Sequence, residues 1–101
     1  MEIPPNDEAA ERAVLGSVLI RPEAIDTACL RLSEGDDFFF PLHRRVWDAM
    51  RSLRREGRAI DAVTVHGTGL GGVAVGELLS MAAEVPTSEN IDHYIRIVID
   101  K

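Results

Sequence analysis

The chain has little cysteine, little lysine and no long apolar run, and each shortage excludes a class of protein. Cys29 is the only cysteine, so an intramolecular disulfide and a cysteine-based zinc site are excluded, as is common in a reducing compartment. Lys101 is the only lysine, and a phosphate-binding loop of the form G-x-x-x-x-G-K-[ST] needs a lysine directly after its second glycine. The chain alone is therefore not expected to be an enzyme that hydrolyses nucleotides.

The remaining composition is that of one globular domain. No apolar stretch reaches the roughly 18 residues of a membrane span, and the first residues lack the basic region of a signal peptide, so we expect a cytoplasmic protein without membrane contact. Of the 101 residues, 46% are hydrophobic and 28% are charged, which is too apolar for a disordered chain. The net charge of −6 argues against a protein that coats nucleic acid by charge alone.

Prolines, capping residues and apolar periodicity predict an all-α fold. The first helix is expected to follow a cap at Asn6 or Asp7 and to end at Ile20; its polar edge consists only of Glu8, Glu11 and Arg12. Such a helix belongs at the centre of the fold. Gly16 costs it about 1 kcal/mol relative to alanine, which is easiest to explain if another helix crosses closely over it.

The rest of the chain has the same helical pattern. A second helix is predicted from Pro22, with an apolar face of Ala24, Ile25, Ala28, Cys29 and Leu32. Later elements are predicted at residues 41–56, 62–66 with Asp61 as cap, 77–84, and from Ile91 towards the end after a cap at Thr87 or Ser88. The glycines between Gly67 and Gly76 are interpreted as a flexible connection.

The segment at residues 38–56 has the clearest division of faces. At least one ring of Phe38, Phe39 and Phe40 is expected to enter the core from a non-helical segment, and His43 is expected to make a structural hydrogen bond rather than to act in catalysis. The apolar face of the following helix contains Leu42, Val46, Ala49, Met50 and Leu53, with Trp47 at its margin. Arg44, Arg51 and Arg55 lie on the opposite face.

Two surfaces are candidates for binding a partner. Residues 44–58 hold six of the eleven basic residues, so the stripe of Arg44, Arg51 and Arg55 is a solvated face, a contact for an acidic protein, or a contact for DNA phosphates. In the last helix, Ile91, Ile95 and Val98 are predicted to point inward. Tyr94 and Ile97 widen that apolar arc, so they either meet a continuing segment or second subunit, or lie within the domain's own core.

Three apparent catalytic or binding motifs are better explained by structure. Gly67 to Gly72 satisfies G-x-G-x-x-G, but neither a strand before it nor a second strand after it is found, so a mobile loop is favoured over a dinucleotide site. His43, His66 and His93 have no metal-ligand spacing. Asp36 and Asp37 are interpreted as helix caps. No catalytic, cofactor-binding or metal-binding residue is therefore predicted in this chain.

The order of several short motifs resembles one family over nearly the whole chain. These motifs are A-V-L-G at residues 13–16, H-x-x-V-W-x-A-M at 43–50, D-x-V-T at 61–64 and V-P-x-x-x-N at 85–90. Together they resemble the amino-terminal domain of the replicative hexameric DNA helicases, the DnaB family. Two departures are a shortened segment between Thr64 and the glycines and the lack of an aromatic residue before Leu78.

The resemblance implies a compact orthogonal bundle of about six helices at residues 1–101, with the ATP-hydrolysing motor domain, its ATP and its magnesium outside this chain. It implies a non-catalytic role in self-association, as part of the collar of a hexamer, and in docking primase, whereas DNA is bound mainly by the motor domain. It also implies that His43 and Asp61 are structural. The alternatives are a stand-alone helical module that binds DNA or a protein, a helicase-interaction domain of a primase, and a nucleotide-binding fragment.

Overall fold

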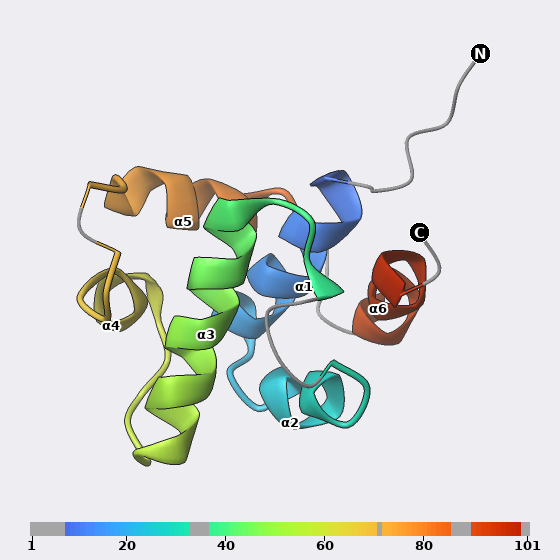
Figure 1. Cartoon of the computed structure of the whole chain (residues 1–101), viewed down its shortest axis with the longest axis horizontal. Coiled ribbons are helices and arrows are strands. Elements are labelled where there is room, and N and C mark those ends of the chain that lie inside the picture. Colours follow the sequence, from blue (N-terminus) through green and yellow to red (C-terminus); the bar gives the residue numbers. More distant parts are fainter. Residues whose placement is uncertain (1–7, 33–36, 71, 86–89, 100–101) are drawn as a thin grey trace.

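The first helix, α1 (Glu8–Ile20), lies at the centre of the fold, and four of the other helices pack against it (Figure 1). This computed structural model describes residues 8–32, 37–70, 72–85 and 90–99. Within these ranges the chain forms six helices and no strand, as predicted. The caps expected at Asn6 or Asp7 and at Thr87 or Ser88 lie outside the described residues.

Helices that cross one another surround α1 (Figure 1). After α1 come α2 (Ala24–Cys29), α3 (Pro41–Arg55), α4 (Ala62–His66), α5 (Val75–Ala83) and α6 (Ile91–Ile99). Helix α1 packs mainly against α5 and α6 and also touches α2 and α3, while α4 bridges α3 and α5. Its buried Val14, Leu15 and Val18 therefore meet apolar side chains from several directions. The central position predicted for this helix is confirmed.

At Gly16 the backbones of α1 and α5 approach each other closely. A Cβ atom at this position would overlap the carbonyl oxygen of Met81 and come within 2.8 Å of Cγ2 of Val85. Only glycine lets the two backbones approach so closely. The predicted helix crossing over Gly16 is therefore confirmed.

The core residues predicted from α3 and from the segment before it are largely confirmed. Phe38 is buried from a non-helical position and packs against Trp47, with ring centroids 5.6 Å apart. Trp47 is fully buried rather than at the margin of the apolar face, because Phe38 covers it from the side. Arg55 ends the helix, and Gly57 follows with a φ of 71°, which favours glycine.

Predictions for the shorter helices need three corrections. Helix α2 begins at Ala24, because residues 21–23 form a turn in which the N–H of Ala24 donates to the carbonyl of Arg21. Cys29 is exposed rather than part of the apolar face; it lies about 100° further round the helix than Ala28. Helix α5 begins at Val75, before the predicted Glu77.

The predicted cap of α4 is confirmed in detail. Asp61 accepts a hydrogen bond from the N–H of Thr64 at 2.9 Å, and its own N–H donates to Oγ1 of Thr64 at the same distance. This reciprocal capping box explains how a helix of only five residues is held. In the glycine segment that follows, Leu70 is buried in the core.

Candidate interaction surfaces

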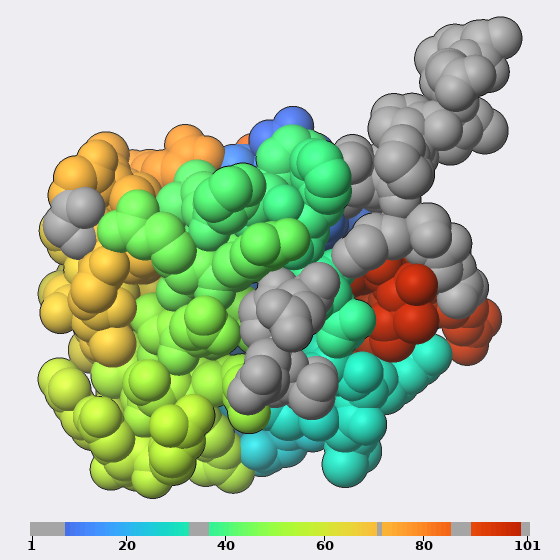
Figure 2. Space-filling view, in the orientation of Figure 1, coloured from blue at the N-terminus to red at the C-terminus, as the bar shows by residue number. Residues whose placement is uncertain are grey.

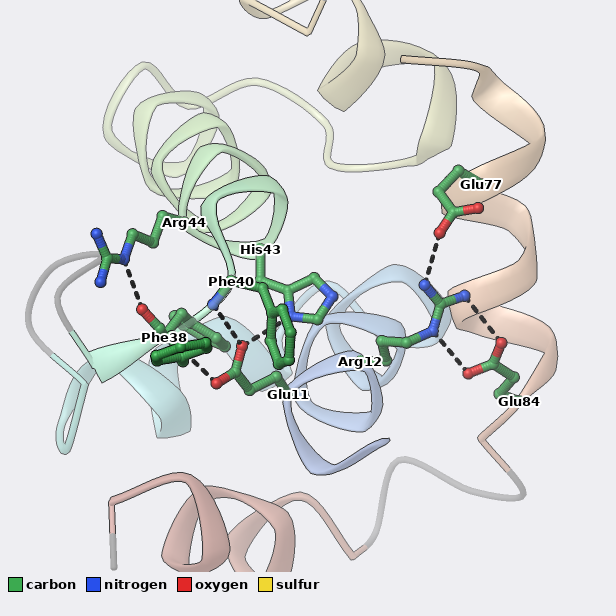
Figure 3. Close-up of polar contacts among 9 residues, drawn as sticks. Glu11, Arg12, Phe38, Phe40, His43, Arg44, Glu77 and Glu84 are labelled. Atoms are coloured by element: carbon green, nitrogen blue, oxygen red, sulfur yellow. Dashed lines mark hydrogen bonds and ion pairs between the residues drawn. The ribbon is translucent and has the colours of Figure 1, made fainter. Parts of the chain in front are cut away.

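Two neighbouring polar residues of α1 point to opposite sides of the helix and tie it to different elements (Figure 3). Glu11 points towards the start of α3, whereas Arg12 points towards α5. Both were predicted to lie on the polar edge of α1. Glu11 is nevertheless completely buried, because the start of α3 covers this part of the edge.

Glu11 binds three groups at the start of α3. Its Oε2 accepts the N–H of Phe39 at 2.8 Å, and its Oε1 accepts the N–H of Phe40 at 3.4 Å. The same Oε1 lies 2.7 Å from Nδ1 of the buried His43. The N-cap residue of α3 is Phe40, whose side chain has no acceptor, so a carboxylate from α1 supplies one near the positive end of the helix. The structural hydrogen bond predicted for His43 is therefore confirmed.

Arg12 holds α1 against α5 through two carboxylates. Its Nη1 lies 2.6 Å from Oε1 of Glu77, and its Nε and Nη2 donate to the two oxygens of Glu84 at 2.9 and 2.8 Å. The hydrogen bonds to Glu84, and then those to Glu77, raise the pKa of Arg12 above its ordinary value despite partial burial. In return, the hydrogen bond from Arg12 lowers the pKa of Glu84. Arg12, Glu77 and Glu84 therefore form a structural clamp between α1 and α5.

The predicted arginine stripe is on the surface of α3. Arg44 and Arg55 are exposed and Arg51 is half-buried. Nε of Arg44 donates to the carbonyl oxygen of Phe38 at 2.6 Å, which fixes the turn before the helix. Arg51 and Arg55 make no ion pair with any residue in the described ranges.

The other arginines of this segment are already engaged. Arg45 donates to the carbonyl of Gly69 at 2.9 Å. Arg54 binds both carboxylate oxygens of Asp26 at 2.8 and 2.7 Å, and these hydrogen bonds raise the pKa of Arg54. This pair forms one wall of an open pocket of about 230 Å³ between the end of α3 and the start of α2.

On α6, the inward face is as predicted. Ile91, Ile95 and Val98 are buried, while Tyr94 and Ile97 are half-buried and pack against the edge of the core. The contact of Tyr94 and Ile97 with a further segment or subunit stays a prediction.

A third exposed surface, on α5, was missed in the sequence. Leu79 is 56% exposed and Val63 is 71% exposed. Along α5, Gly76, Ser80 and Ala83 are also exposed and share the face of Leu79. We call Gly76, Leu79, Ser80 and Ala83 the uncharged surface; Val63 is exposed on the neighbouring helix α4. The signal that could have indicated it is that Glu77 is the only charged residue of α5.

The dinucleotide interpretation of the glycine segment is excluded by its surroundings. The element before it is the helix α4, which ends at His66, whereas a dinucleotide site needs a strand there. In the described ranges no three His, Cys, Asp or Glu side chains gather to hold a metal ion. No helix found there is long and apolar enough to cross a membrane.

The fold and its surfaces define a helical domain with buried polar ties between helices and exposed charged and apolar surfaces. Residues 3–100 match the family model described as the DnaB-like helicase N-terminal domain. The chain therefore belongs to this family, as its motifs indicated.

Individual relatives support the same assignment. The chain is 38% identical over 106 residues to the replicative DNA helicase DnaB of Mycobacterium leprae and 35% identical over 107 residues to the replicative DNA helicase DnaC of Bacillus subtilis. These matches cover 97% and 98% of this chain but only 17% and 23% of the relatives. The chain thus spans about a fifth of the curated relatives that it matches.

A solved structure gives the same result for the fold. The crystal structure of the N-terminal domain of DnaB helicase from Mycobacterium tuberculosis matches with a TM-score of 0.85 and 36% identity. That match covers 96% of this chain and 71% of the other. The predicted helical fold is thereby confirmed.

Proposed function

We propose that this chain is the assembly domain of a replicative DNA helicase whose ATP-hydrolysing motor lies outside the 101 residues. In this role the domain contributes to the collar of a hexamer and offers a docking surface to primase. The whole-chain match to the DnaB-like N-terminal domain, over about a fifth of each relative, is the observation that carries the proposal. Relatives named replicative DNA helicases support the parental activity.

The uncharged surface is the strongest candidate for contact between subunits. Leu79 and Val63 expose apolar side chains to solvent, and exposed apolar surface is typical of sites that contact another protein. The small residues beside Leu79 allow another helix to approach closely. Burial of apolar area at roughly 25 cal/mol per Å² then favours association. Tyr94 and Ile97 offer a second, smaller contact at the other side of α1.

Sedimentation velocity over a range of concentrations tests self-association. Leu79→Glu is expected to weaken it at least about tenfold, because a charge would be buried in the contact. Leu30→Glu is the matched control, since Leu30 is 86% exposed at the end of α2 and lies outside the uncharged surface. Equal loss in both variants, or no loss in either, would show that subunits do not meet through Leu79.

Primase docking needs a separate measurement. The carboxy-terminal domain of the primase from the same organism is titrated by calorimetry against this chain. Saturable binding is expected. Binding that requires the motor domain and is absent for residues 1–101 would remove primase docking from this domain.

The proposed division of labour also predicts that the isolated chain does not hydrolyse ATP. A phosphate-release assay checks this, with the parental helicase as positive control. Turnover by the purified chain that disappears when one of its own residues is changed would contradict the proposal.

A further inference from the structure

One face of α3 carries a regular pattern of charge. Arg44, Asp48, Arg51 and Arg55 are spaced by four, three and four residues, so they lie along a single face of the helix. The order of charges is plus, minus, plus, plus. We call these four residues the α3 charge face. Figure 2 views the molecule from the side on which α3 runs across the front.

Most charged side chains of this face make no ion pair within the described part of the chain, whereas the neighbouring arginines bind other residues of it. Arg45, Arg54 and Arg58 bind Gly69, Asp26 and Glu56 respectively. By contrast, Arg51, Arg55 and Asp48 make no ion pair with any part of the chain that the structure describes. Arg44 gives one hydrogen bond to a backbone carbonyl and remains exposed.

We propose that the α3 charge face binds an acidic helical segment of a partner protein, whose acidic residues meet the three arginines and whose basic residue meets Asp48. A second helix laid along α3 has the same rise of about 1.5 Å per residue, so its side chains repeat with matching spacing. Four complementary pairs then form over roughly 16 Å. Charge pairs of this kind contribute mainly partner selection and association rate.

The sign of Asp48 is what favours a protein over a nucleic acid. Phosphates of DNA are all negative, with one per about 3.4 Å of each strand, so a strand that follows α3 would meet Asp48. The net charge of −6 also repels a polyanion. A protein helix can place a positive side chain opposite Asp48 and negative ones elsewhere. The α3 charge face does not include any residue of the uncharged surface, so this inference and subunit assembly can fail independently.

A designed peptide tests the pattern and not only the charge. The matched peptide is a helical, alanine-rich sequence with Glu, Glu, Lys and Glu at spacings of four, three and four, which complements the face in antiparallel orientation. The control peptide has the same composition with Lys exchanged for the first Glu, so that Lys meets an arginine and a Glu meets Asp48 in either orientation of the peptide. A fluorescein-labelled dT20 oligonucleotide is the nucleic-acid probe. Binding to the full 101-residue chain is followed by fluorescence anisotropy.

The matched peptide is expected to bind several-fold more tightly than the control peptide. The double variant Arg51→Glu and Arg55→Glu should weaken its binding at least about tenfold, while Arg96→Glu, an exposed arginine on α6, should leave it unchanged. Asp48→Lys should weaken binding of the matched peptide and strengthen binding of dT20. Circular dichroism of each variant checks that the helices are intact.

Several results would overturn the proposal. Equal affinity for both peptides would show that the face does not read the pattern. No binding of the matched peptide up to roughly 1 mM would show that the face is only solvated. If dT20 alone binds to the unchanged chain and is released by the double arginine variant, the face is a nucleic-acid surface.

Discussion

Single residues hold this domain together through groups far away in the sequence, and Glu11 is the clearest case. Its carboxylate satisfies two backbone N–H groups and the ring of His43 while fully buried. Removing it leaves those donors without an acceptor, a larger effect than the loss of an exposed ion pair. Glu11 therefore fixes the position at which α3 begins.

The first prediction concerns this carboxylate. Glu11→Ala is expected to lower the free energy of unfolding by about 3 kcal/mol, because three donors lose their buried acceptor. Urea unfolding at pH 7 measures the loss. Glu11→Gln keeps one oxygen acceptor and should lose less. If both variants unfold at the same urea concentration as the original chain, Glu11 does not have this role.

The second prediction concerns close approach at Gly16. Gly16→Ala should destabilise the domain by roughly 1 to 3 kcal/mol, since the added methyl group meets the backbone of α5, which cannot move aside like a side chain. Gly76→Ala is the matched control, because a Cβ there has open space, and alanine in a helix is favoured by about 0.5 to 1 kcal/mol. The melting temperature, measured by thermal unfolding in dilute solution, should therefore fall for Gly16→Ala and rise for Gly76→Ala.

Residue-scale features differ in how far the sequence could predict them. The close helix crossing at Gly16 was predictable because a glycine within a run of good helix-forming residues is unusual and needs a local reason. The buried position of Glu11 was not, because its partners are 28 to 32 residues away and its place on the helical wheel indicates solvent. The partners of Arg12 are 65 and 72 residues away. Local sequence patterns contain no information about such pairings.

Among the elements, α1 and α5 are joined by both packing and charge. The crossing at Gly16 fixes their distance, and the hydrogen bonds from Arg12 to Glu77 and Glu84 fix the face of α5 that turns to α1. The opposite face of α5 is therefore presented to solvent. This orientation is what exposes Leu79.

The third prediction gives the clamp a pH dependence. Because Arg12 lowers the pKa of Glu84 in the folded state, Glu84 contributes stability above the ordinary glutamate pKa of about 4.3, and this contribution is lost as the pH falls through the lowered folded value. Glu84 is half exposed, so the contribution is at most about 1 kcal/mol. The stability difference between the original chain and Glu84→Gln should be largest at neutral pH.

Urea unfolding at pH 7 and at pH 3 checks this prediction. The free energies of unfolding of the original chain and of Glu84→Gln should differ at pH 7 and become equal at pH 3. A difference that grows on acidification would mean that the sign of the linkage is wrong. Leu30→Gln is the control, because Leu30 is exposed and uncharged, so its replacement should give the same free energy of unfolding relative to the original chain at both pH values.

Prolines and capping residues were sufficient to predict some of the helix boundaries. The start of α3 at Pro41 and the capping of α4 by Asp61 were predicted because proline and aspartate act on their own helix. The exposure of Cys29 was missed because a six-residue helix buries only a narrow face, and tertiary packing decides which one. The uncharged surface was missed because an apolar face of α5 looks like core in the sequence alone.

At the scale of the whole molecule, the central α1 packs against α2, α3, α5 and α6, and α4 bridges α3 and α5. Val63 and Leu79 remain outside the core. The fold and family were predictable because four short motifs occur in order over nearly the whole chain. Whether the predicted surfaces, the arginines of α3 and Tyr94 and Ile97 of α6, meet a partner stays a prediction, because arginines and apolar residues have the same appearance in a sequence whether they face solvent or another protein.

The most direct test of the assembly role is the mass of the parental helicase in solution. Mass photometry would compare the original protein with Leu79→Glu and with Leu30→Glu, each at concentrations near the point at which the ring dissociates. We expect that Leu79→Glu shifts the population from hexamers to smaller species, whereas Leu30→Glu does not. An unchanged hexamer population with Leu79→Glu would contradict the claim that this domain joins subunits through its uncharged surface.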